Sequence, residues 1–166
     1  MARGAAYRVP MRRRREGRTD YRRRLHILRA NSARVVVRTS LRNLTIQFAE
    51  FADTGDRVRA SAVSVELGEF GWTAPTGNLP AAYLTGLLAG KRAAAAGVQN
   101  AVLDLGRSVP APGGRVFAAL KGVLDGGVKV PHSAEVLPKD FRLTGQHINA
   151  EVASLFAQVK GKLEAM

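Results

Sequence analysis

The sequence contains no cysteine. This absence excludes disulfides, thiolate zinc sites, iron–sulfur clusters and thiol catalysis. The three histidines, His26, His132 and His147, lie far apart with no paired spacing, so we expect neither a metal site nor a cofactor. No apolar run approaches the roughly 18–20 residues of a membrane span. We therefore expect no membrane partner.

Acidic residues are scarce and unevenly distributed. The 166 residues include 13 Asp and Glu against 26 Lys and Arg, a formal net charge of +13. Residues 1–42 hold fourteen arginines and only two acids, Glu16 and Asp20, which gives +12. Residues 43–166 hold twelve bases and eleven acids, which gives +1. A nearly neutral body with so cationic an N-terminal segment favours a polyanionic partner.

The N-terminal segment does not have the pattern of a targeting signal. A polar run follows Arg12–Arg15, where a secretory signal needs an apolar stretch. We therefore expect the segment to belong to the mature, cytoplasmic protein. Its first 30 residues contain eleven arginines, with Tyr7 and Tyr21 interleaved, and arginine favours bidentate phosphate contacts and stacking on bases. Residues 1–33 are thus predicted to form a basic arm that binds nucleic acid, the alternative being a solvated tail.

Three short segments, 34–39, 44–48 and 57–62, have the alternating pattern of strands. Their short connections predict an antiparallel meander whose apolar face is covered by helices. The opposite face is expected to collect Arg34, Arg38, Asn43, Gln47, Arg57 and Arg59. That face is either an ordinary solvated surface or, because the basic arm runs directly into it, part of a nucleic-acid-binding surface.

The middle of the chain alternates between helix and strand signals. Asn78 is a suitable N-cap for a helix over about residues 80–96. Residues 101–105 are predicted to form a short buried strand, and a second helix follows a Gly- and Pro-rich loop over about 115–125. Together with the meander, these elements predict an α/β fold with a mixed sheet, with residues 34–143 as its core domain.

Gly86 and Gly90 lie in a segment that ends with Lys91 and Arg92, which partly resembles a phosphate-binding loop. The spacing between the glycines is one residue too short, and Arg92 occupies the position at which Ser or Thr would hold magnesium. We expect instead that the two glycines, four residues apart, let this helix approach the sheet closely.

A C-terminal helix is predicted to begin near residues 144–147. Its apolar stripe at helical spacing comprises Ile148, Val152, Leu155, Phe156, Val159 and Leu163. Residues 144–166 are therefore interpreted as an amphipathic helix. It packs either on its own domain or on a partner, since terminal helices are often docking elements.

No arrangement of residues demands an enzyme. Asp104, at the end of a predicted strand, is a candidate catalytic acid, but a metal-dependent nuclease needs several converging carboxylates. Nothing in the sequence places Glu66 or Glu69 beside it. An Asp in this position is more often a turn cap, and His132 has no Ser, Cys or acid placed as its partner. We expect no catalytic residues.

Two long motifs carry a family resemblance: YRVPMRRRREGRTDY at residues 7–21 and GWTAPTGNLPAAYLTGLLAG at residues 71–90. Both resemble archaeal large-subunit ribosomal protein L-eighteen, a family that binds 5S ribosomal RNA. The match continues in collinear order through residues 101–106, 114–122 and 130–132, and it reaches the last predicted helix.

The resemblance implies an α/β sandwich with a mixed sheet, preceded by an extended basic arm. It further implies a structural constituent of the large subunit that binds 5S ribosomal RNA and helps to attach it to the large-subunit ribosomal RNA in the central protuberance. The implied partners are these two RNAs, ribosomal protein L-five and other central-protuberance proteins. The implied location is the cytoplasm, in the ribosome.

The same resemblance implies which residues contact RNA. In the arm they are Arg12, Arg13, Arg14, Arg15, Arg18, Tyr21, Arg22, Arg23 and Arg24. On the sheet and its first turn they are Arg38, Thr39, Ser40, Arg42, Asn43 and Gln47. Weaker candidates in two loops are Thr76, Gly77, Asn78, Gly113, Gly114 and Arg115. The backbone amides of Gly113 and Gly114, near a helix start, are expected to donate to phosphate.

Two functions from other classes remain as alternatives at this point. One is a metal-dependent RNA-processing nuclease that uses Asp104, and the other is a chaperone-like arm that binds any polyanion. Identifying the RNA that co-purifies with the protein, and asking whether that RNA is cut, separates the three hypotheses.

Overall fold

The computed structural model describes residues 4–166, so residues 1–3 of the predicted arm lie outside the described residues. Its strands are β1 Ala33–Thr39, β2 Leu44–Glu50, β3 Arg57–Val63 and β4 Ala101–Asp104. Its α-helices are α1 Arg12–Arg15, α2 Tyr21–Leu28, α3 Leu79–Ala95, α4 Arg115–Asp125, α5 Asp140–Leu143 and α6 Ala150–Glu164. Two 3-10 helices are η1 Ser64–Phe70 and η2 Ala134–Val136.

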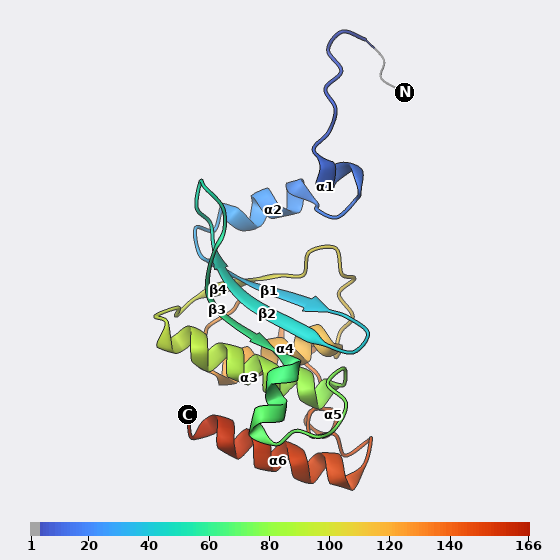
Figure 1. Ribbon diagram of the computed structural model, residues 1–166, viewed down its shortest axis with the longest axis vertical. Helices are drawn as coiled ribbons and strands as arrows, with labels where there is room; N and C mark the ends of the chain where they lie inside the picture. Colours follow the sequence, from blue (N-terminus) through green and yellow to red (C-terminus); the bar gives the residue numbers. More distant parts are fainter. Residues whose placement is uncertain (1–3) are drawn as a thin grey trace.

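The elements form layers (Figure 1). The sheet lies in the middle, the arm helices α1 and α2 lie on one side of it, and α3 and α4 lie on the other side, with α6 beyond α3. The sheet therefore has one face packed on helices and one face turned toward the basic arm.

Within residues 4–166, no helix combines the length and the apolarity needed to cross a bilayer.

The sheet has the strand order β3-β2-β1-β4. The pairs β1–β2 and β2–β3 are antiparallel, and β4 is parallel to β1. Alternation places Val35, Val37, Ile46 and Phe48 on the face toward the helices, where each is fully buried. The predicted α/β fold with an antiparallel meander in a mixed sheet is confirmed.

A β-bulge changes the predicted phase of β3. The pairing shifts between Phe48 and Ala49, so that Arg59 has no residue opposite it. A guanidinium N–H of Arg59 donates to the carbonyl of Ala96, 3.1 Å away at the end of α3. The prediction that Arg57 and Arg59 lie on the polar face is therefore wrong: they lie on the helix side. The extra residue of a bulge is invisible in a simple alternating pattern.

The helices on the covered face begin and end where the sequence indicated. The Ala81 N–H donates to the Asn78 side chain at 2.8 Å, so Asn78 caps α3 as predicted. Helix α4 follows Gly113, whose φ of +68° suits glycine in a tight turn. Both helices contribute to a single core that also includes Trp72 and Leu67.

Glycines allow α3 and α4 to pack unusually closely. A Cβ added at Gly86 would overlap the carbonyl of Ala119, and one at Gly122 would overlap the carbonyl of Tyr83. A Cβ at Gly90 would lie 2.8 Å from the carbonyl oxygen of Val123. The expectation that Gly86 and Gly90 bring their helix close to the sheet is therefore corrected, because the close neighbour is α4.

The C-terminal helix begins later than predicted. Gly145 adopts φ +81° and the Asn149 side chain caps the helix, so α6 starts at Ala150. Ile148 consequently precedes the helix and is 47% exposed, outside the apolar stripe to which we assigned it. The helix itself packs on α3, where the rings of Phe156 and Tyr83 lie 5.4 Å apart. Burial of Tyr83 and its hydrogen bond to Asp125 both raise the pKa of its phenol.

The close packing of α3 on α4 generates a stability prediction. Gly86→Ala is expected to lower the free energy of unfolding by about 1–3 kcal/mol, because the new methyl group forces two packed helices apart. The control is Gly161→Ala in α6, where a Cβ meets nothing within 4 Å. That change is expected to raise stability by up to about 1 kcal/mol through helix propensity. Chemical denaturation measures both, and equal stability of the two variants would contradict the packing.

Candidate RNA interface

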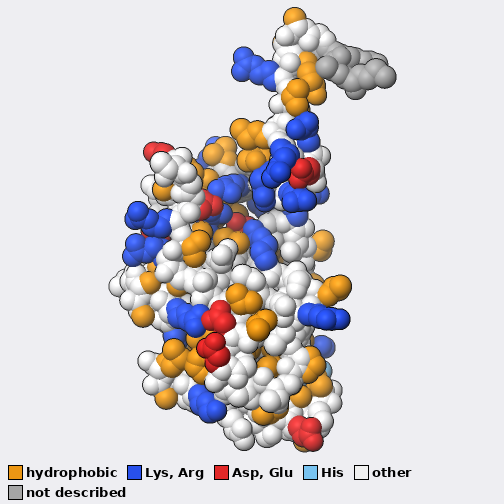
Figure 2. Space-filling view, in the orientation of Figure 1, with side chains coloured by type: hydrophobic (Ala, Val, Ile, Leu, Met, Phe, Trp, Pro, Cys, Tyr) orange, Lys and Arg blue, Asp and Glu red, His pale blue; other side chains and the backbone are white. Residues whose placement is uncertain are grey.

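A basic cleft separates the arm from the polar face of the sheet. Its walls come from the α1–α2 segment, from β1 and β2, and from the turn after β4. Figure 2 shows Lys and Arg side chains gathered where the arm meets the body. The charged residues lining this arm cleft are Arg13, Arg18, Asp20, Arg23, Arg24, Arg34, Arg38, Asp56, Asp104 and Arg107. With seven arginines and three aspartates, the cleft carries a formal charge of +4.

The arm wall is a short helix with its own N-cap. The Asp20 carboxylate accepts hydrogen bonds from the backbone N–H of Arg22 at 3.0 Å and of Arg23 at 3.1 Å. The hydrogen bond from Arg23 is the largest of the effects that hold the pKa of the exposed Asp20 carboxyl below its usual value. Gly17, at φ +63°, turns the chain between α1 and α2. The arm thus contains two short helices, where the family resemblance implied an extended basic arm.

A buried arginine forms the floor of the cleft. Arg34 is 3% exposed, and its two terminal nitrogens donate to Asp104 at 2.9 Å and to Asp56 at 2.6 Å. Asp104 reaches it because β4 runs parallel to β1 in register with it. A buried guanidinium is tolerated only when it is paired in this way. Arg34 lies on the polar face, as predicted, but it is enclosed there.

Asp104 also caps the turn after β4. Its carboxylate accepts the Gly106 N–H at 2.8 Å, and it lies 3.5 Å from a guanidinium nitrogen of Arg38. The interpretation of Asp104 as a turn cap is confirmed. Arg38 donates as well to the carbonyl oxygens of Val37 and Asp104, each at 2.9 Å, while about half of its side chain stays exposed.

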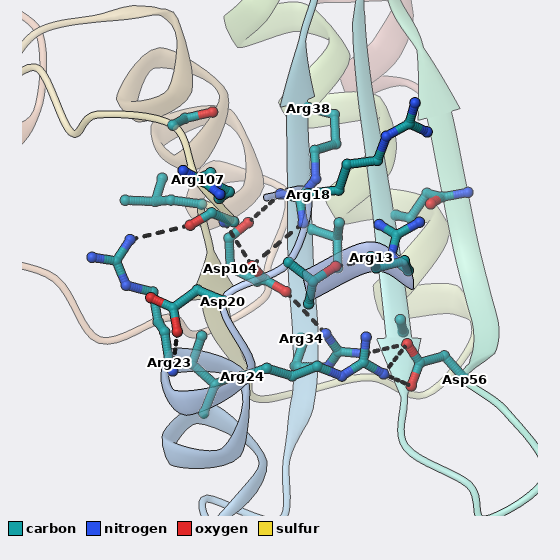
Figure 3. A pocket seen from close by; sticks show the side chains of 18 of the residues that line it. Arg13, Arg18, Asp20, Arg23, Arg24, Arg34, Arg38, Asp56, Asp104 and Arg107 are labelled. Carbon is teal, nitrogen blue, oxygen red and sulfur yellow. Dashed lines mark hydrogen bonds and ion pairs between the residues drawn. The ribbon is translucent and has the colours of Figure 1, made fainter. Parts of the chain in front are cut away.

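Further arginines connect the arm to the body (Figure 3). Arg24 donates to both carboxylate oxygens of Asp56, at 3.0 and 2.9 Å. Arg23 donates to the carbonyl of Gly106 at 3.1 Å, and Arg107 donates to the carbonyl of Gly17. Candidate RNA-binding arginines therefore fall into two groups, those used within the protein and those that point outward.

The outward group lies mainly in the arm. Arg12, Arg14, Arg15 and Arg22 are exposed, and of these only Arg12 has an ion pair in the described chain, with Glu16 on the next turn. Arg18 also pairs with Glu16, at 3.0 Å, and Arg13 donates to Thr19. Tyr21 is half-buried beside Arg14 and Arg22. Arg42, at the tip of the β1–β2 turn, is exposed as well.

A second cluster forms at the β1–β2 turn. The Thr76 hydroxyl lies 2.8 Å from the Asn43 side-chain oxygen and 2.8 Å from the Arg42 carbonyl. Arg115, the first residue of α4, donates to the carbonyls of Ser40 at 2.9 Å and Gly77 at 3.2 Å. The structure therefore brings together predicted residues from the β1–β2 turn, from the loop before α3 and from the start of α4. The hydrogen bonds of Arg115 connect these three segments.

The remaining candidates occupy different surroundings. Gln47 lines the arm cleft, Thr39 lines a separate hollow in front of α4, and Asn78 caps α3. The Gly113 N–H donates to the Val136 carbonyl and the Gly114 N–H to the Ala111 carbonyl, each at 2.9 Å. The expectation that these two amides donate to phosphate is therefore corrected, because both are already hydrogen-bonded.

Sequence reasoning missed three residues that shape this surface. Asp56, in the connection between the second and third predicted strands, and Arg107, in the Gly- and Pro-rich loop, were not among the predicted site residues. Arg34 was predicted on the polar face, but its burial was not. The arm itself has few acidic residues, so its arginines need carboxylate partners from elsewhere in the chain. This scarcity was the one signal in the sequence that pointed to a residue such as Asp56. Within residues 4–166, no three His, Cys, Asp or Glu side chains are grouped so as to hold a metal ion. Glu66 lies away from Asp104 and binds Arg92 and the Val63 N–H instead.

Comparisons with known proteins point to one family. A family model described as "Ribosomal large subunit proteins 60S L5, and 50S L18" matches residues 5–99. The large ribosomal subunit protein uL18 of Halobacterium salinarum is 52% identical over 155 residues, which cover 93% of this chain and 85% of that protein. The uL18 of Korarchaeum cryptofilum is 51% identical over 164 residues, covering 99% and 83%. That of Haloarcula marismortui is 51% identical over 148 residues, covering 89% and 79%.

The paired floor of the cleft generates a second stability prediction. Asp104→Ala is expected to lower the free energy of unfolding by about 3 kcal/mol, because it leaves the buried Arg34 with one carboxylate instead of two. Asp53→Ala is the control, since Asp53 is exposed in the β2–β3 turn, and its effect should stay within about 0.5 kcal/mol. Urea unfolding measures both variants. A loss below about 1 kcal/mol at Asp104 would show that Arg34 does not depend on it.

Proposed function

This chain belongs to the uL18 family of large-subunit ribosomal proteins, and we propose that it binds 5S ribosomal RNA and helps to attach it to the large-subunit ribosomal RNA in the central protuberance. Membership of the family indicates a structural role in the large ribosomal subunit, in the cytoplasm, rather than a catalytic one. Ribosomal RNA and other ribosomal proteins are therefore its partners. Among these proteins we propose ribosomal protein L-five as a neighbour.

The observation that carries the proposal is the joining of the arm to the polar sheet face in one cationic cleft. Net charge alone would favour binding to any polyanion, because neutralisation of phosphates does not depend on nucleotide sequence. A cleft with fixed walls presents a defined shape as well. RNA helices are distinguished by shape, by 2′-hydroxyls and by splayed bases, so a fixed surface is what specific RNA binding requires.

We assign different tasks to the parts of the chain. Residues 1–33 form the RNA-binding arm, whose exposed arginines neutralise phosphates, with Tyr7 and Tyr21 available for stacking on bases. Residues 34–143 form the core domain that fixes the sheet surface. Residues 144–166 complete the body through α6, which buries Val152, Phe156 and Val159. No residue of α1 or α2 is buried, which supports treating the arm as an addition to a complete core.

The proposal predicts a preference for one RNA at elevated salt. At roughly 0.3 M salt, 5S ribosomal RNA is expected to outcompete transfer RNA by at least about tenfold, because specific complexes exceed non-specific ones by wide margins. Gln47→Ala, on the cleft wall, is expected to shrink that preference without changing the salt dependence. Gln158→Ala, exposed on α6, is the control and should leave both unchanged. Competition binding with labelled 5S ribosomal RNA gives these values.

Three outcomes of that experiment oppose the proposal. Equal competition by transfer RNA would leave a general polyanion-binding arm. An unchanged preference in Gln47→Ala would show that the cleft wall does not select RNA. Cleavage of the RNA in magnesium, lost in Asp104→Asn, would favour a nuclease.

A further inference from the structure

We propose that Arg24 and Asp56 dock helix α2 on the sheet before RNA is bound, so that Arg24 positions the arm instead of contacting RNA. The docking itself is a property of the free protein. Its consequence for affinity rests on the RNA binding proposed above. We call Arg24, Arg34 and Asp56 the docking cluster.

The geometry of the docking cluster joins three separate elements. Arg24 comes from α2, Asp56 from the turn before β3, and Arg34 from β1 (Figure 3). Arg24 contacts both carboxylate oxygens of Asp56, at 3.0 and 2.9 Å, and Arg34 contacts one of them at 2.6 Å. A single carboxylate therefore links the arm to a residue fixed in the sheet. Short charge-assisted contacts of this kind are stronger than neutral hydrogen bonds.

The surroundings of the cluster strengthen these ion pairs. The side chain of Arg34 is 3% exposed, that of Asp56 is 27% exposed and that of Arg24 is 36% exposed. Fully exposed pairs contribute little because water and salt screen them. Here one partner is buried and the carboxylate is mostly covered, so screening is reduced. Asp56 also offsets the repulsion that the two guanidiniums would otherwise exert on each other.

Little else holds α2 in place. Helices α1 and α2 contain no buried residue, and Leu25 on α2 is 55% exposed. The remaining contacts between arm and body include the hydrogen bonds from Arg23 to Gly106 and from Arg107 to Gly17. The apolar contribution of α2 is small: Ile27 is half-buried and lines the cleft with Val36, Ala49 and Val58, but it is not part of the buried core. The position of the arm therefore depends mainly on arginine contacts, and Arg24 is the residue of α2 that forms an ion pair with the body.

A docked arm has a definite consequence for RNA binding. Ordering a flexible segment on binding costs conformational entropy, and a segment that is already ordered avoids that cost. Asp56 is negative, so a simple charge argument predicts that its removal strengthens binding to a polyanion. If Asp56 instead keeps the arm in its binding position, its removal weakens binding. The sign of the effect distinguishes the two.

The test uses two substitutions in the same turn with the same change of charge. Asp56→Asn removes the docking carboxylate, whereas Asp53→Asn removes an exposed carboxylate that has no ion pair in the described chain. In the free full-length protein, amide hydrogen exchange of residues 21–28 is expected to quicken at least about tenfold in Asp56→Asn and to stay unchanged in Asp53→Asn. Exchange of α3 amides reports whether the body remains folded. Affinity for purified 5S ribosomal RNA is expected to be about threefold to tenfold lower in Asp56→Asn than in Asp53→Asn.

Three further variants keep the test decisive if Asp56→Asn disturbs the body. Arg24→Ala leaves both carboxylates on Arg34, and it is expected to quicken exchange of α2 as Asp56→Asn does. Arg22→Ala, on the same helix and exposed, is expected to lower RNA affinity without changing exchange in the free protein. Arg24→Lys, which keeps the charge, should partly restore the slow exchange.

The possible failures are distinguishable. Equal exchange of α2 in Asp56→Asn and Asp53→Asn, with Arg24→Ala also unchanged, would overturn the docking whatever the RNA does. Tighter RNA binding by Asp56→Asn than by Asp53→Asn would overturn its consequence and show that Asp56 competes with phosphate. If the unaltered protein failed to bind 5S ribosomal RNA, the proposed function would fall, and exchange in the free protein would still decide the docking.

Discussion

The pairing of buried Arg34 with Asp104 and Asp56 is the interaction on which the proposed RNA-binding surface depends. It places a cation within the sheet's polar face and supplies it with two carboxylates from opposite sides, one at the end of β4 and one in the β2–β3 turn. These carboxylates in turn contact Arg38 and Arg24. A face that would otherwise be a row of repelling arginines thus becomes an ordered surface with a defined cleft.

The arginines of this protein divide into those that contact other parts of the protein and those that point outward. Arg23, Arg24, Arg34, Arg107 and Arg115 direct donors to carbonyls or carboxylates of the protein itself. Those on α1, together with Arg22 and Arg42, are exposed. A family motif does not distinguish the two groups. Sequence similarity shows that an arginine is present at a position, but not which atoms its guanidinium contacts. Arg23 and Arg107 are exposed as well, so the two groups differ in their partners: within residues 4–166 the second group makes no side-chain hydrogen bond or ion pair between arm and body, and it is the group that we propose for phosphate contacts.

Much of the fold was predictable from local chemistry. Alternation of valines predicted the inward face of β1, Asn78 marked the start of α3, and the loop that ends in Gly113 and Gly114 marked the start of α4. What the sequence did not reveal depends on distant residues. The bulge that turns Arg59 to the helix side, the approach of α3 to α4 at Gly86, and the pairing of Arg34 with Asp56 each require knowing what lies across the fold. Periodicity carries no such information.

The most direct test of a joint surface of arm and sheet is ultraviolet cross-linking of the protein to total ribosomal RNA, followed by mass spectrometry of the linked peptides. If arm and sheet bind together, 5S ribosomal RNA will be linked both to peptides within residues 12–24 and to peptides within residues 38–47. Cross-links confined to the arm, or distributed over unrelated RNAs, would contradict a joint surface and leave only a cationic tail.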